Sequence, residues 1–177
     1  MIDYGKFQFA APVCTQVSWT MQVVYFLGIY PLPGPPGTTD LPFKKDDKNH
    51  LKVSIVRHPC TWLAALYACS WPWPAQYASG ELADLAICPF DEFVRKYLAT
   101  SPAGVSAVFN RYESDVNLRY EDFPHCLFSF LESIGTRIPD SSQIPIIIPE
   151  GDRPQWNPDL YREVLRENRE FCERYEY

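Results

Sequence analysis

The feature that most constrains this chain is the order in which short apolar runs alternate with helical patterns. The run LKVSIV at 51–56 is continuous and rich in β-branched residues, which is typical of a parallel strand covered on both faces. Short runs at 6–10 and 116–120 predict two more strands, and a helical pattern follows each of the three. We therefore predict an α/β fold, a three-layer sandwich around a central, mainly parallel sheet that binds ligands at the carboxyl ends of its strands.

Helical spacing, together with start and stop signals, predicts the helices between and after these strands. They are expected at 18–28, 61–69, 91–100, 103–114, 124–135 and 157–177. The Pro-rich segment 31–49 is predicted to be a long loop that covers the acceptor side, and IPIIIP at 144–149 is predicted to be extended. With 177 residues and no evident internal repeat, the chain is expected to form a single domain, residues 1–177.

Composition and charge narrow the classes of function. The net charge is -6 and no basic run is longer than Lys44-Lys45, which argues against a nucleic-acid partner. No stretch reaches the ~18 apolar residues that span a bilayer, and the N-terminus shows no secretory signal. We therefore expect a cytoplasmic protein that does not bind membranes. The six cysteines lack metal-ligand spacing, so we expect free, mostly buried thiols and no metal site.

Three strand ends carry groups that can bind anions. In the first, FQFAAPVCTQVSWTMQ, loop amides and a helix N-terminus come together, although Ser18 could be a plain N-cap and Trp19 a core residue. In the second, Arg57 ends a buried strand, where a guanidinium needs either an anionic ligand or a structural salt bridge. In the third, VNLRYEDFP brings the Tyr-Glu-Asp triplet at 120–122 to a strand end.

These three units, in this order, resemble the sulfotransferase family that uses 3′-phosphoadenosine 5′-phosphosulfate. That family has a first loop of the form PxxGxTW, a second motif similar to VRxPxxxxxSxY, and a later strand that ends in a Tyr-Glu-Asp triplet. The matching residues here are Pro12, Ser18 and Trp19, then Val56, Arg57, Pro59 and Tyr67, then Tyr120, Glu121 and Asp122. The resemblance covers about residues 6–135, and the small size is similar to that of compact microbial or viral members.

The resemblance implies a P-loop-like architecture and a reaction. A sulfuryl group would pass from 3′-phosphoadenosine 5′-phosphosulfate, without a metal, to a hydroxyl or amine of a small-molecule or carbohydrate acceptor. The main chain at Gln16 and Val17 and the hydroxyl of Ser18 would cradle the 5′-phosphosulfate, which makes Ser18 the catalytic candidate. The oligomeric state is left open.

The resemblance also assigns the nucleoside end of the donor site. Trp19 would contact the adenine, and Tyr120 would touch the base. Arg57 would bind the 3′-phosphate, and Ala65 stands where the family has a serine that joins this arginine. Arg153, in GDRPQW, is a basic side chain that could compensate for groups this chain lacks.

Three departures from the family pattern keep a second function open. Gln16 replaces a glycine, Val13 replaces a lysine near the leaving group, and Ala65 replaces the serine. The alternative is a catalytically degenerate member that keeps the fold and acts as a binding or scaffold protein. A kinase-like enzyme is disfavoured because neither a P-loop lysine nor a metal-binding carboxylate follows the first strand.

The sequence does not identify the base that would deprotonate the acceptor. His50 precedes strand 51–56 and should lie at the end of that strand opposite to the ligand edge. His58 follows Arg57, but its side chain should point away from that of Arg57, and His125 is expected to be a polar residue in the first turn of a helix. The loop acids Asp40, Asp46 and Asp47 could reach the site, although a charged loop is usually only solvated.

Overall fold

The computed structural model describes residues 1–12, 14–15, 17–32, 42–43, 50–68, 88–101, 104–140, 144 and 154–177. Several predictions fall outside these residues: those on Gln16, Arg153, Asp40, Asp46, Asp47, most of 31–49 and all but one residue of 144–149. The chain forms two compact units, each made of two stretches. The first comprises Met1–Arg57 and Phe109–Pro149, and the second His58–Val108 and Glu150–Tyr177. That they make one domain stays a prediction.

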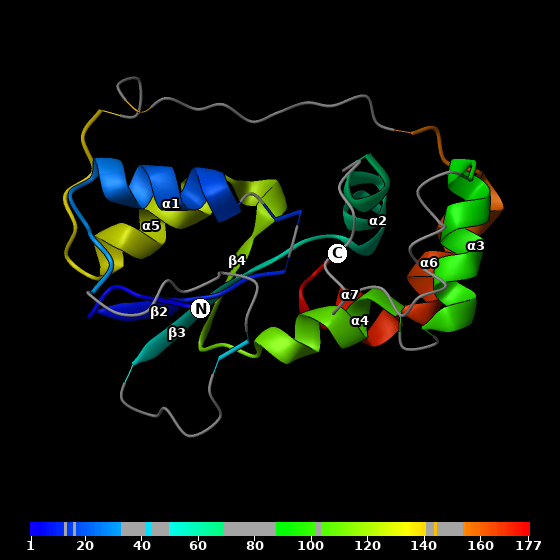
Figure 1. Cartoon of the computed structure of the whole chain (residues 1–177), viewed down its shortest axis with the longest axis horizontal. Coiled ribbons are helices and arrows are strands. Elements are labelled where there is room, and N and C mark those ends of the chain that lie inside the picture. The colour runs from blue at the N-terminus through cyan, green and yellow to red at the C-terminus, as the bar shows by residue number, and fades with distance from the viewer. Residues whose placement is uncertain are drawn as a thin grey trace. The chain divides into compact units, whose positions relative to one another are not determined.

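The first unit contains a four-stranded mixed sheet in the order β1-β2-β3-β4 (Figure 1). The strands are β1 (Ile2–Asp3), β2 (Phe7–Phe9), β3 (Leu51–Val56) and β4 (Val116–Arg119). β2, β3 and β4 are parallel, which confirms the three predicted strands, and β1 pairs antiparallel with β2. The short β1 was not predicted. It reaches β2 through a tight turn at Gly5, whose φ of 77° favours glycine.

One face of this sheet carries the core of the first unit. Alternate side chains of the strands, such as Phe7, Phe9 and Ile55, point to that face and are buried. They pack against the buried sides of α1 (Val17–Phe26) and α5 (His125–Ser133), which lie together over the strands in Figure 1. The predicted helical layer is therefore present on this face.

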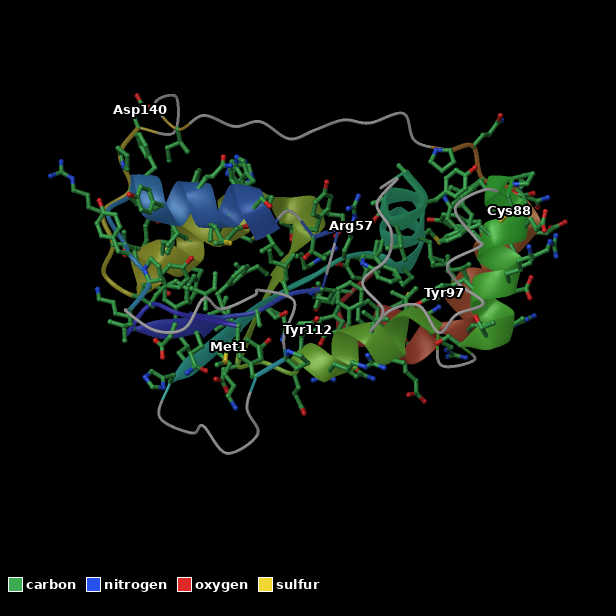
Figure 2. All side chains as sticks on the ribbon, viewed as in Figure 1. Met1, Arg57, Cys88, Tyr97, Tyr112 and Asp140 are labelled. Atoms are coloured by element: carbon green, nitrogen blue, oxygen red, sulfur yellow. The ribbon has the colours of Figure 1, made fainter. Side chains whose placement is uncertain are left out.

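The opposite face of the sheet is more polar. The alternation that buries Phe7 and Phe9 under α1 turns Gln8 and Ser54 to this side, and both side chains are nonetheless buried. A small apolar cluster is formed by Ala10, Phe43 and Tyr112 packed with Met1. Figure 2 shows Met1 and Tyr112 on the side of the sheet away from α1 and α5. A second helical layer here stays a prediction.

The second unit is helical in its described residues. It contains α2 (Pro59–Ala68), α3 (Phe90–Thr100), most of α4 (Gly104–Phe109), α6 (Pro158–Glu167) and α7 (Arg169–Arg174). α2, α3 and α6 pack against one another through buried side chains that include Trp62, Phe93 and Leu160. The predicted helices are confirmed, although α4 ends at Phe109 and gives way to the 3-10 turn η2 (Asn110–Tyr112).

The prediction of one continuous C-terminal helix over 157–177 is wrong at Asn168, where α6 ends and α7 begins. Asn168 is 1% exposed, and its Oδ1 accepts hydrogen bonds from the backbone N–H and the hydroxyl of Ser106, both at 3.0 Å. Its Nδ2 donates to the Val164 carbonyl at 2.8 Å. The two bonds to Ser106 tie the break between α6 and α7 to α4.

The molecule thus belongs to the coarse α/β class, as predicted, with a mixed sheet and seven α-helices among the described residues. None of the helices in that part of the chain has the length and apolar character needed to cross a membrane.

Candidate functional site

The register of the sheet places Arg57 beside Tyr120. Val56 of β3 pairs with Arg119 of β4, so the residue that follows each strand emerges at the same edge. The guanidinium carbon of Arg57 lies 3.7 Å from the centroid of the Tyr120 ring, which is a close cation–π contact. Tyr120 also opens the 3-10 turn η3 (Tyr120–Asp122), which contains the rest of the predicted triplet. Two of the three predicted strand ends are therefore in direct contact.

The first loop joins the same site through its backbone. Arg57 Nη1 donates a hydrogen bond of 2.6 Å to the carbonyl oxygen of Cys14, in the connection between β2 and α1. Arg57, labelled in Figure 2, is only 7% exposed, so neighbouring protein groups rather than water must stabilise its charge. The three strand ends converge on this arginine, as the parallel topology predicted.

The backbone of the first loop is unusual at Cys14, which has a φ of 60°. This left-handed conformation is uncommon for a residue other than glycine. Next to it, Thr15 is fully buried and its hydroxyl donates to the Pro12 carbonyl. The loop thus points a carbonyl at Arg57, an arrangement that the sequence did not indicate because cysteine carries no turn signal.

Ser18 and Val17 begin α1 at the same edge of the sheet as Arg57. Val17 is the first helical residue and Ser18 the second, so Ser18 lies in the first turn and is not the N-cap. Its side chain is exposed. Exposed first-turn groups beside helix amides are suited to bind an anion, which is the role predicted for this segment.

Trp19 lies in the core of the first unit. It is 5% exposed, and its ring packs edge-on against Phe123 with the centroids 5.7 Å apart. Phe123 in turn lies 6.4 Å from the ring of Tyr120. The core alternative weighed from the sequence therefore describes the environment of Trp19, and a base could reach only a small part of the indole.

The remaining predicted residues, Ala65, Glu121 and Asp122, are not part of the contact between Arg57 and Tyr120. Ala65 is partly exposed and lies in α2 of the second unit. Glu121 and Asp122 are exposed, and Asp122 Oδ2 lies 3.6 Å from Arg119 Nε. These two acids follow the sheet edge without entering the contact between Arg57 and Tyr120.

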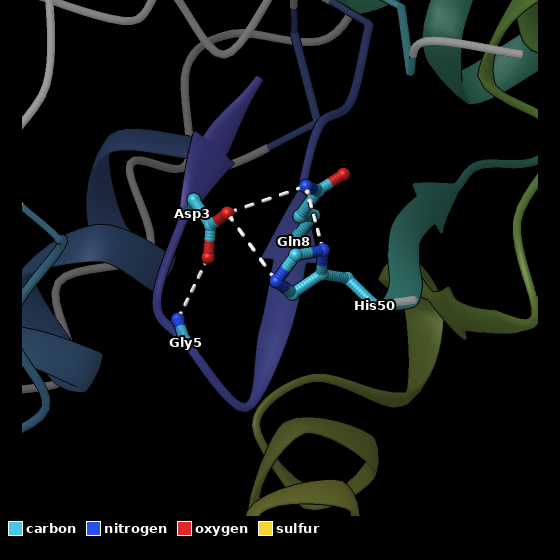
Figure 3. A network of polar contacts seen from close by, with 4 residues as sticks. All are labelled: Asp3, Gly5, Gln8 and His50. Atoms are coloured by element: carbon cyan, nitrogen blue, oxygen red, sulfur yellow. Dashed lines mark hydrogen bonds and ion pairs between the residues drawn. The ribbon is translucent and has the colours of Figure 1, made fainter. Parts of the chain in front are cut away.

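His50 lies before the start of β3, at the end of the sheet opposite to Arg57, as predicted. Its Nε2 is 3.8 Å from Asp3 Oδ2, and its Nδ1 is 3.4 Å from Gln8 Nε2 (Figure 3). Gln8 Nε2 and the backbone N–H of Gly5 both donate to the Asp3 carboxylate. This network links β1, β2 and the residue before β3, so His50 has a structural role at the end of the sheet opposite to Arg57.

The other two histidines also have identifiable surroundings. His58 Nδ1 accepts the backbone N–H of Cys60 at 3.2 Å, which caps α2, and its ring packs against Tyr161 and Tyr177. His125 is exposed in the first turn of α5.

The thiol of Cys126, in α5, reaches the carboxyl end of β4 and is protonated at neutral pH. Burial raises the pKa of Cys126 to about 12, helped by the negative charge of Asp122. Its Sγ donates to the Arg119 carbonyl at 3.2 Å. Cys126 therefore stabilises the strand end and is a poor nucleophile.

Two further results concern metal binding and similarity to known proteins. The described residues contain no group of three or more His, Cys, Asp or Glu side chains arranged to hold a metal ion. No protein family, curated protein or solved structure matches this chain.

Proposed function

We propose that this protein is a sulfotransferase that transfers a sulfuryl group from 3′-phosphoadenosine 5′-phosphosulfate to a hydroxyl or amine. The observation that carries the proposal is Arg57, which is 7% exposed and contacts both the first loop and the end of β4. A cation enclosed at the ligand edge of a parallel sheet is well placed to bind a phosphate. The order of the three sequence motifs supplies the choice of donor.

The donor has two separated anionic groups, and the same edge of the sheet offers two kinds of anion-binding group. Arg57 would bind the 3′-phosphate with charged N–H donors. The first turn of α1, with Val17 and the exposed Ser18, would bind the 5′-phosphosulfate through helix amides and a hydroxyl. The finer architecture, a P-loop-like three-layer sandwich, belongs to this proposal, as does a cytoplasmic location.

Sulfuryl transfer asks little covalent chemistry of a protein. It needs the acceptor oxygen or nitrogen in line with the sulfur, a base for the acceptor proton, and donors for the charge that grows on the leaving phosphate. In this proposal the hydroxyl of Ser18 and the amides of the first turn of α1 donate to that charge. The acceptor is a small molecule or a carbohydrate.

The test compares two nucleotides that differ only in the 3′-phosphate. We expect calorimetric titration to show that 3′-phosphoadenosine 5′-phosphate binds more tightly than 5′-AMP. Arg57→Lys should weaken binding of the first by about 1–3 kcal/mol, because lysine loses the planar donors, and should leave 5′-AMP nearly unchanged. Arg162→Lys, at an exposed arginine of α6, is the matched control.

A specific observation favours the alternative, a degenerate member that acts as a binding or scaffold protein. Arg57 already donates to the Cys14 carbonyl and stacks on Tyr120, so it has a structural role without a ligand. If the folded protein binds neither nucleotide while Arg57→Lys lowers the melting temperature, the enzyme proposal fails and the scaffold function is supported. Transfer of labelled sulfuryl from the donor to any acceptor would decide for the enzyme.

A further inference from the structure

We propose that Tyr120 is a positioning residue that fixes the plane of the Arg57 guanidinium, and that it thereby makes the site selective for a terminal oxyanion. This inference rests on the proposed function for the identity of the ligand. The assignment differs from the sequence-based prediction, in which Tyr120 touches the base of the nucleotide.

The first step is the stack itself. The guanidinium carbon of Arg57 lies 3.7 Å from the ring centroid of Tyr120, at a residue that is 7% exposed. At this separation the two planar groups are in van der Waals contact, and cation–π attraction strengthens as water is excluded. One face of the guanidinium is therefore covered by the ring. The same contact covers one face of the ring, which a nucleotide base then cannot use.

The second step is that the ring is itself supported from behind. Tyr120 packs against Phe123 at 6.4 Å, and Phe123 packs against Trp19 of α1 at 5.7 Å. Trp19 is 5% exposed and belongs to the core of the first unit. The three rings form a continuous aromatic column, Trp19–Phe123–Tyr120, that ends at the guanidinium of Arg57. The column gives Trp19 a structural role in the site.

The third step concerns the direction from which a ligand can approach. All N–H donors of a guanidinium lie in its plane, and one of them, on Nη1, points at the Cys14 carbonyl. Because the donors lie in this plane, an anion that hydrogen-bonds to Arg57 meets it at its edge, and the Tyr120 ring fixes the direction in which that edge faces. A terminal phosphate or sulfate group presents two charged oxygens that can be engaged in this way, and these charge-assisted bonds are stronger than those to a neutral base edge or a sugar hydroxyl.

The first experiment observes the stack directly and needs no nucleotide. The Nε–H signal of Arg57, identified in the NMR spectrum by its loss in Arg57→Lys, should be displaced by the ring current of Tyr120. Tyr120→Phe keeps the aromatic face and should preserve the displacement, whereas Tyr120→Leu should abolish it. An Arg57 signal without displacement in the wild-type protein overturns the proposal, whether or not the variants fold.

The second experiment measures the consequence for binding. Tyr120→Leu should weaken binding of 3′-phosphoadenosine 5′-phosphate about tenfold, which corresponds to about 1.4 kcal/mol, while Tyr120→Phe should stay within about threefold. Binding of 5′-AMP should change less in both. Phe123→Leu removes the support behind the ring and should weaken binding in the same direction. Tyr25→Leu, at a tyrosine that is 63% exposed in α1, is the control.

The outcomes separate this inference from the proposed function. Unchanged affinity in a folded Tyr120→Leu, with a wild-type protein that binds the nucleotide, overturns the positioning role and leaves the function standing. A wild-type protein that binds no nucleotide overturns the function and the selectivity that depends on it. In that case a displaced Arg57 signal that Tyr120→Leu abolishes still supports positioning of the guanidinium by the ring.

Discussion

At the scale of single residues, Arg57 joins three segments that are distant in the sequence. Its side chain holds the first loop through the Cys14 carbonyl and the end of β4 through the Tyr120 ring. A buried cation that lost either contact would be left partly uncompensated, which is costly. The same contacts that make Arg57 a candidate ligand-binding group therefore also make it part of the fold.

The left-handed backbone at Cys14 leads to a prediction about stability. Its φ of 60° strains side chains, and β-branched ones most. We expect Cys14→Gly to be more stable than Cys14→Val by about 1 kcal/mol, with Cys14→Ala between them. Urea unfolding measures the order.

Gln22, exposed inside α1, provides the control for this order. There Gln22→Gly should be less stable than Gln22→Ala by about 1 kcal/mol, because glycine is unfavourable within a helix. If the glycine variant is less stable than the alanine variant at position 14 as well, the backbone at Cys14 is not left-handed in solution.

The sequence predicted some of the residues around Arg57 but not all of the contacts that they make. Arg57 was found because an arginine at the end of a buried β-branched strand is conspicuous. Tyr120 was also assigned to the site from the sequence, and its contact with Arg57 could have been found by counting from the ends of two parallel strands, whose register sets residues 57 and 120 side by side. The Cys14 carbonyl could not, since any residue supplies a carbonyl.

At the scale of elements, the break between α6 and α7 depends on one buried amide. Replacing Asn168 by alanine would leave the backbone N–H of Ser106 without its acceptor. The Val164 carbonyl would lose the side-chain donor and keep the backbone N–H of residue 168. We expect Asn168→Ala to lower the free energy of unfolding by about 2–3 kcal/mol. Thermal or urea unfolding would measure the loss.

An exposed asparagine in the 3-10 turn η2 supplies the comparison for this prediction. Asn110→Ala should change the free energy of unfolding by less than about 0.5 kcal/mol. Equal effects at the two asparagines would mean that the side-chain bonds of Asn168 do not stabilise the break.

The elements themselves were largely predictable, and the failures have a common cause. β3 and the helices have strong local patterns, so their existence followed from periodicity. β1 is too short to show a pattern and exists because β2 offers it an edge. The helix break at Asn168 depends on Ser106, and no local pattern contains that partner. A polar residue in line with the buried Leu160 and Val164 was the available signal.

At the scale of the whole molecule, the buried thiols lead us to expect that the free energy of unfolding falls at alkaline pH. Burial raises the pKa of Cys60, in the second unit, from 9.0 to about 12, and the same cause raises that of Cys126 in the first. Both thiols ionise first in the unfolded chain, so their contribution is complete below pH 9 and is lost as the pH rises toward 12.

For Cys60 the linkage gives a decrease of about 1.4 kcal/mol per pH unit in this window. The contribution of Cys126 is smaller because its side chain is partly exposed and solvent screens it. Urea unfolding between pH 8 and pH 11 should show a shallower slope for Cys60→Ala than for the wild type, at about that difference. Parallel slopes would contradict the assignment of the alkaline loss to this thiol.

The two units alternate along the chain, and this has a consequence for how the protein is made. As the chain is synthesised, residues 58–108 emerge before the second stretch of the first unit, and their own partner stretch follows only after residue 149. The helices α2 and α3 are therefore synthesised before α6, against which they pack. Their apolar side chains, such as Trp62 and Phe93, can be fully buried only after α6 has been made, which is later than β4. We therefore expect that these apolar side chains stay exposed during synthesis until the C-terminal stretch has emerged, which is the condition under which chains aggregate.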